Sequence, residues 1–131
     1  MGEKALVESL INEAGLLIEK LDIIEIFPTF VAWYYYDDAD EWRLLIASPK
    51  LDPLLQKQEH VAYRNVIEVL SSIKSLSISV SDLKLVATSS PLLSAMKFLI
   101  KTDPHSIVRA HFNNCTMNGI FIKEIVVLRS A

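Results

Sequence analysis

The acidic turn that follows a run of aromatic residues contains side chains that could hold a metal ion. Asp38, Asp40 and Glu41 supply carboxylate oxygens, the hard ligands that magnesium and calcium prefer. The turn does not match an EF-hand, because it lacks the glycine at loop position six, and Ser48 or Pro49 falls where the glutamate at position twelve belongs. Acidic residues are common at hairpin tips, so a solvated turn is the simpler interpretation.

An alternative hypothesis comes from a comparison with metal-dependent nucleases. Those enzymes carry an aspartate on one hairpin strand and an acid-x-lysine motif on the next. Residues 41–43 (EWR) offer arginine where lysine is wanted, and residues 82–84 (DLK) have the right types at the start of a later strand. The alternative function is therefore a divalent-metal-dependent hydrolase or nuclease that uses Asp38, Asp40 and Glu41.

Arg109, His111 and Cys115 form a second group with chemical potential. Arg109 and His111 on one strand face could bind a small anion, and His111 could assist Cys115 as a nucleophile. Residues 111 and 115 share a face of a regular strand but lie about 13 Å apart along it, beyond hydrogen-bond reach without a bulge. We expect Cys115 to be a small core or turn residue and His111 to be half-buried and structural.

Glycine and histidine positions argue against several cofactor sites. Gly2, Gly15 and Gly119 are too widely spaced to build a Walker loop or a dinucleotide fingerprint. His105 and His111 would lie roughly 20 Å apart on an extended strand, and no two histidines have the i, i+4 spacing of a helical zinc site. We therefore predict no cofactor.

Most of the aromatic residues fall between positions 27 and 42. Consecutive strand residues point to opposite faces, so residues 33–36 (WYYY) place large rings on both sides of the sheet. One interpretation is that helices cover one face and the C-terminal hairpin partly covers the other. The other interpretation is a recognition surface, because Trp and Tyr are enriched at interface hot spots. The residues of that hypothetical surface are Trp33, Tyr35, Trp42, Arg109 and His111.

Local patterns in the first half of the chain predict two helices and a hairpin. Apolar residues recur at helical spacing from Glu3 to Leu21. Strands are expected at 30–36 and 42–47, joined across the acidic turn. Asp52, as N-cap, and Pro53 then start a second helix that should end between positions 71 and 74.

The second half continues with a strand, a helix and a hairpin. Positions 75–80 are ambiguous between a loop and an edge strand, whereas 83–88 is a stronger strand. Ser90 and Pro91 begin a short third helix that extends to Ile100. The closing hairpin turns at 118–119 (NG), where both residues tolerate the positive φ of a type I′ turn.

That turn sets the register of the hairpin, unless a bulge at Asn113 and Asn114 shifts it. The expected pairs are Ala110 with Val127, Phe112 with Ile125, Arg109 with Leu128 and His111 with Val126. The element order α-β-β-α-β-α-β-β then predicts an α+β fold with one mixed five-stranded sheet and three helices. The two middle helices are expected to connect parallel strands.

Composition bounds the fold and the cellular setting. A chain of 131 residues has the size of one domain, which we place at 1–131. A hydrophobic fraction of 51% and a mean hydropathy of +0.31 favour extra burial by self-association. Apolar runs fall far short of the roughly 18 residues of a membrane span, so no membrane contact is expected. The lone Cys115 fits a reducing cytoplasm.

Charge is unevenly distributed along the chain. Residues 1–50 carry ten acids and four bases, a net charge of −6, and residues 51–131 carry six acids and nine bases, a net charge of +3. The sum of −3 lacks the basic surface that phosphate neutralisation requires, so nucleic-acid binding is disfavoured.

Scattered motifs resemble those of a group of small bacterial proteins that have no assigned activity. They are residues 34–36 (YYY) with the acidic turn, 42–44 (WRL), 47–49 (ASP) and 118–122 (NGIFI). The likeness covers roughly residues 30 to 129 and implies a bacterial cytoplasmic origin, with no site residue to carry over. The leading hypothesis is a non-catalytic protein-interaction module, a homodimer whose aromatic hairpin or apolar C-terminal strand meets a protein partner.

Overall fold

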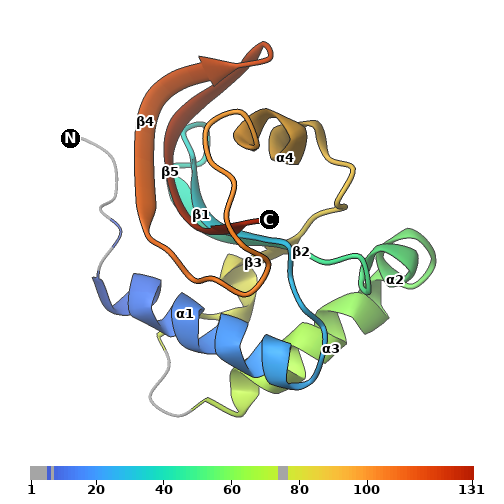
Figure 1. The fold of residues 1–131 in the computed structure, drawn as a ribbon. Helices are drawn as coiled ribbons and strands as arrows, with labels where there is room; N and C mark the ends of the chain where they lie inside the picture. Colours follow the sequence, from blue (N-terminus) through green and yellow to red (C-terminus); the bar gives the residue numbers. More distant parts are fainter. Residues whose placement is uncertain (1–5, 7, 74–76) are drawn as a thin grey trace.

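The computed structural model describes residues 6, 8–73 and 77–131. Within them the helices are α1 (Glu8–Ile23), α2 (Asp52–Lys57), α3 (Glu59–Ser71) and α4 (Pro91–Met96), with a short 3-10 helix η1 (Val80–Asp82). The strands are β1 (Phe30–Tyr36), β2 (Glu41–Ala47), β3 (Leu83–Leu85), β4 (Ala110–Met117) and β5 (Ile120–Ser130). One mixed five-stranded sheet with helices packed on it confirms the predicted α+β class (Figure 1).

The described residues contain four α-helices where the sequence predicted three, because the second helix is split. Gln58 has φ −143° and ψ 66°, so α2 ends before it and α3 begins after it. The predicted capping role of Asp52 is wrong. Its carboxylate accepts hydrogen bonds from the backbone N–H (3.0 Å) and the hydroxyl (2.5 Å) of Thr88, which ties α2 to the segment after β3.

Several element boundaries differ from the predicted ones. β3 spans three residues rather than 83–88, and α4 ends at Met96, where a tighter turn bonds the N–H of Leu99 to the Met96 carbonyl (2.9 Å). The predicted helix start at Glu3 lies outside the described residues, as do positions 75 and 76. Positions 77–79 are not a strand, and Val80 begins η1.

The strands lie in the order β3-β2-β1-β5-β4. β2 and β3 are parallel and the other neighbours are antiparallel, so α2 and α3 do connect parallel strands as expected. The same expectation is wrong for α4. β3 and β4 lie at opposite edges of the sheet, so α4 belongs to a connection that crosses a whole face. Figure 1 shows α1 and α3 on one side of the sheet and α4 on the other.

Both faces of the central strands are buried, which explains the run of aromatic and apolar residues in β1. Residues of one face join a core with α1 and α3, among them Val31, Trp33, Tyr35, Leu44 and Leu128. Residues of the other face join a core with α4, among them Phe30, Ala32, Leu45, Ile125 and Val127. Phe112, Cys115 and Ile120 of the C-terminal hairpin pack against this second core, as the sequence suggested.

The C-terminal hairpin has the predicted turn and register. Asn118 and Gly119 have φ values of 50° and 78°, and the pairs of Ala110, His111 and Phe112 are those expected. Arg109 lies before the first residue of β4, so its predicted pair with Leu128 is not part of the ladder.

The β4–β5 ladder is interrupted where the sequence suggested a bulge, but the register does not shift. Asn114 has a φ of 49°, and Asn113 pairs with Glu124 while Cys115 pairs with Ile122, so each strand passes over one residue. As a result, alternate side chains of β4 that lie on one face of the sheet before Asn114 lie on the opposite face after it. Cys115 packs in the core on the α4 side, whereas His111 pairs with Val126 of the other core. The expectation that residues 111 and 115 share a face is therefore wrong.

Candidate functional site

The candidate site is a cavity at the outer edge of the first hairpin. β3 pairs only with Leu44, Leu45 and Ile46, so the edge of β2 before Leu44 has no strand beside it among the described residues. η1 leads into β3 next to this gap, and a cavity of about 340 Å³ lies there. Its lining residues are Leu6, Leu10, Trp33, Glu41, Trp42, Arg43, Ser81 and Asp82.

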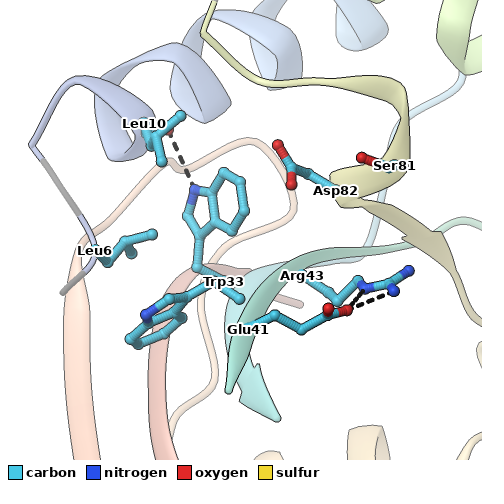
Figure 2. Close-up of a pocket in the computed structure, with 8 residues that line it drawn as sticks. Leu6, Leu10, Trp33, Glu41, Arg43, Ser81 and Asp82 are labelled. Atoms are coloured by element: carbon cyan, nitrogen blue, oxygen red, sulfur yellow. Dashed lines mark hydrogen bonds and ion pairs between the residues drawn. The ribbon is translucent and has the colours of Figure 1, made fainter. Parts of the chain in front are cut away.

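The cavity has an indole and aliphatic floor. Trp33 is only 1% exposed, and its Nε1 donates a hydrogen bond to the Leu10 carbonyl of α1 (3.2 Å), which fixes the ring (Figure 2). Trp42 is 7% exposed and packs at 5.4 Å between ring centroids against Tyr35. An apolar floor of this kind accepts the hydrocarbon part of a ligand or of a partner side chain.

Three charged side chains form the rim. Glu41 Oε2 accepts hydrogen bonds from Nε and Nη2 of Arg43, both at 2.5 Å. Asp82 Oδ2 accepts from the backbone N–H of Ser79 (2.9 Å), which closes the capping box of η1. Figure 2 shows Asp82 near the Trp33 ring and the Glu41–Arg43 pair lower in the view, on β2. Two carboxylates and one guanidinium give this lining a net charge of −1.

Helix α1 is joined to the wall of the cavity by Glu13. Its Oε1 accepts hydrogen bonds from the backbone N–H groups of Ser77 (2.6 Å) and Ile78 (3.2 Å), just before η1. The carboxylate thus ties the segment before η1 to α1.

The expected recognition surface is not an exposed face. Trp33, Tyr35 and Trp42 are 1%, 3% and 7% exposed, because α1 and α3 cover the side of the sheet to which they point. These aromatic residues are core residues, and Trp33 and Trp42 also line the cavity. The burial of these three rings under α1 and α3 agrees with the first of the two interpretations that the sequence left open.

Arg109 and His111 make separate contacts. Arg109 forms an ion pair with Glu8 and donates to Asn12 Oδ1 (2.9 Å), so it binds the start of the hairpin to α1. His111 Nε2 lies 2.6 Å from Glu124 Oε2 on the neighbouring strand. The two side chains do not converge on one anion, and each is paired with a carboxylate.

The acidic turn distributes its carboxylates rather than gathering them. Asp40, at φ 50°, accepts a hydrogen bond from the Tyr35 hydroxyl (2.6 Å), and Glu41 pairs with Arg43. Asp38 lines a second cavity with Tyr36 and Lys84. In the part of the chain that the structure describes, no three His, Cys, Asp or Glu side chains are grouped as metal ligands.

Tyr34 lies partly buried against the core on the α4 side of the sheet. Burial raises the pKa of its hydroxyl above the ordinary value of 10.0, and Tyr36 and Cys115 raise it further. The Tyr34 hydroxyl therefore stays protonated near neutral pH and is no base.

Sequence reasoning named several residues of the cavity but did not place them together. Ser81 and Asp82 face it because β3 pairs in parallel with β2, and no local signal in the sequence gives that pairing. Asp82 was noticed only as part of an acid-x-lysine motif. The sequence placed Glu41 and Arg43 in or beside the second strand of the first hairpin. It did not predict that the two side chains pair with each other.

A comparison with protein-family models finds no match, and searches of curated proteins and of solved structures find no significant match. The resemblance to small bacterial proteins thus stays a prediction. No described helix combines the length and the apolar character needed to cross a bilayer.

Proposed function

We propose that the protein is a non-catalytic protein-interaction module that forms a homodimer through the outer edge of β4. The observation that carries this proposal is the position of β4, an eight-residue strand at the edge of the sheet. An edge strand presents unpaired backbone N–H and C=O groups and can pair with another strand. A second copy provides an identical strand, which can pair antiparallel about a two-fold axis.

The outward groups can be assigned near the hairpin turn. Met117 and Ile120 flank a two-residue turn, so they form a hydrogen-bonded pair, and the next pair, Thr116 and Phe121, does not. The N–H and C=O of Thr116 consequently point away from β5. Thr116 is exposed and its neighbour Phe121 is 55% exposed, so the backbone edge lies beside apolar surface that a second copy could cover.

β4 lacks two common devices that keep edge strands apart. Its sequence AHFNNCTM contains no lysine and no proline. The interruption at Asn114 divides β4 into two paired segments, 110–113 and 115–117, and Thr116 lies in the second. We place this module in the bacterial cytoplasm, in keeping with the lone Cys115 and with the sequence resemblance.

Oligomeric state tests the proposal directly. Wild type should sediment as a dimer at high concentration, and Thr116→Pro, which removes an outward donor without removing a β4–β5 hydrogen bond, should sediment as a monomer. Thr116→Val is the matched control, because it keeps the N–H, and it should remain dimeric. Thr116→Lys is a second disruptive variant if proline lowers the thermal stability. A wild type that stays monomeric, or a folded Thr116→Pro or Thr116→Lys that stays dimeric, would overturn the proposal.

A further inference from the structure

A second cavity, next to the candidate cavity, contains the ammonium group of a lysine beside an aromatic ring and carboxylates. This second cavity, of about 250 Å³, is lined by Tyr36, Asp38, Ala39, Glu41, Arg43 and Lys84. The Nζ of Lys84 lies 5.2 Å from the centroid of the Tyr36 ring, within the range of a cation–π contact. The hairpin thus has, on this side, an aromatic and acidic environment that accommodates the chain's own lysine.

The first cavity is larger and is also lined by aromatic rings and carboxylates. Among the described residues, no lysine lines it. Its floor has two indoles, and Trp is the best aromatic partner for a cation. Glu41 and Arg43 largely neutralise each other at 2.5 Å, which leaves the charge of Asp82 without a cationic partner in the lining. Asp82 Oδ2 is used by the Ser79 N–H, so Oδ1 remains to accept a further hydrogen bond.

We propose that the cavity beside β2 binds an aliphatic ammonium group of the size of a lysine side chain. The ammonium lies at Asp82, and the hydrocarbon stem lies on Leu6, Leu10 and the indoles. A volume of about 340 Å³ is at the small end of ligand pockets, so one side chain fits better than a large cofactor. This site is independent of the β4 edge, because it lies at the opposite side of the sheet.

Intrinsic fluorescence gives a specific readout. Trp33 and Trp42 are the two tryptophans of the chain, and both line this cavity. Three probes of equal length differ in charge: n-butylammonium, n-butanol and n-butyrate. We expect saturable quenching or a spectral shift with n-butylammonium, and an affinity for n-butanol that is weaker by about three- to tenfold. Equal affinity for n-butanol, stronger binding of n-butyrate, or no saturable response to n-butylammonium would overturn the proposal.

Matched variants locate the binding charge. Asp82→Asn keeps the size and a capping oxygen but removes the charge, so it should reduce the affinity for n-butylammonium while leaving n-butanol unchanged. Asp38→Asn removes a charge from the acidic turn of the first hairpin, outside this cavity, and should leave both affinities unchanged. Equal losses in the two variants would show a diffuse charge effect and would contradict a site at Asp82.

A further arm distinguishes a free amine from a lysine of a partner protein. Nα-acetyl-lysine amide carries the same ammonium on a peptide-like backbone. Binding of this probe at least as tight as that of n-butylammonium shows an opening that admits a protein-bound lysine. Exclusion of the probe while n-butylammonium binds shows a site for a free amine. Both results support an ammonium site, and each can be obtained whether or not the protein dimerises.

Discussion

Arg129 is a charged residue whose side chain lies in the interior of the protein. Its guanidinium is fully buried and donates to both carboxylate oxygens of Asp22, each at 2.9 Å, and to the backbone carbonyls of Pro28 and Ser106. One side chain of β5 therefore joins the end of α1, the start of the first hairpin and the loop before β4. A buried charge is tolerated because every contact is a charge-assisted hydrogen bond.

Removal of the Asp22 charge should leave the Arg129 guanidinium buried and incompletely paired. We expect Asp22→Asn to lower the free energy of unfolding by about 2–3 kcal/mol, measured by urea titration. Glu19→Gln removes a carboxylate from the exposed side of the same helix, so it should change that free energy by less than about 0.5 kcal/mol. Similar effects of the two substitutions would show that the Asp22–Arg129 pair contributes little.

Sequence reasoning could not assign this pair. Asp22 and Arg129 are 107 positions apart, and a lone arginine in an apolar strand gives no sign of its partner. The same limit applies to the candidate cavity, which is formed by parts of α1, the first hairpin and η1. Local residue types suggested a metal site at the acidic turn and a recognition surface of aromatic residues. The cavity and the burial of the aromatic rings depend on contacts between residues far apart in the sequence, which local patterns do not reveal.

Elements with strong local signals were predicted well, and those that depend on tertiary contacts were not. The turn at Asn118 and Gly119 fixed the C-terminal register, because positive φ is a local requirement that few residues meet. The sequence predicted neither the break at Gln58 nor the early end of β3, after which Thr88 makes a tertiary contact with Asp52. Helix periodicity and cap motifs contain no information about either.

Two glycines provide an element-scale test, because the same substitution should act in opposite directions. Gly119 has a φ of 78° and no atom within 4 Å of an added Cβ, so Gly119→Ala should cost about 1 kcal/mol through backbone strain alone. Gly15 lies within α1, and its added Cβ would meet Ile107 Cγ2 at 3.9 Å, an ordinary contact. Gly15→Ala should stabilise the protein by about 0.5–1 kcal/mol. Urea unfolding measures both effects, and two changes of the same sign would contradict the assignment.

For the whole molecule, the high apolar content is explained by a sheet buried on both faces. Each face has its own core, one with α1 and α3 and the other with α4, so the central strands carry apolar residues on both faces. The exposed large apolar side chains are spread over separate elements, with Ile23 at 75%, Phe98 at 70% and Phe121 at 55%. The high hydropathy of the chain is therefore not in itself an argument for self-association. The proposal of a dimer rests on the edge strand β4.

A divalent ion that bound the acidic turn would stabilise the whole folded domain by mass action, so thermal unfolding tests the alternative function. Asp40 is held by the Tyr35 hydroxyl at 2.6 Å, and Glu41 is paired with Arg43. Recruiting both carboxylates to one ion would break these contacts, which offsets the gain from coordination. We therefore expect millimolar magnesium or manganese to leave the melting temperature of the wild type unchanged. A rise that saturates with ion concentration and is lost in Asp38→Asn would instead establish a metal site at the turn and reopen hydrolase or nuclease activity.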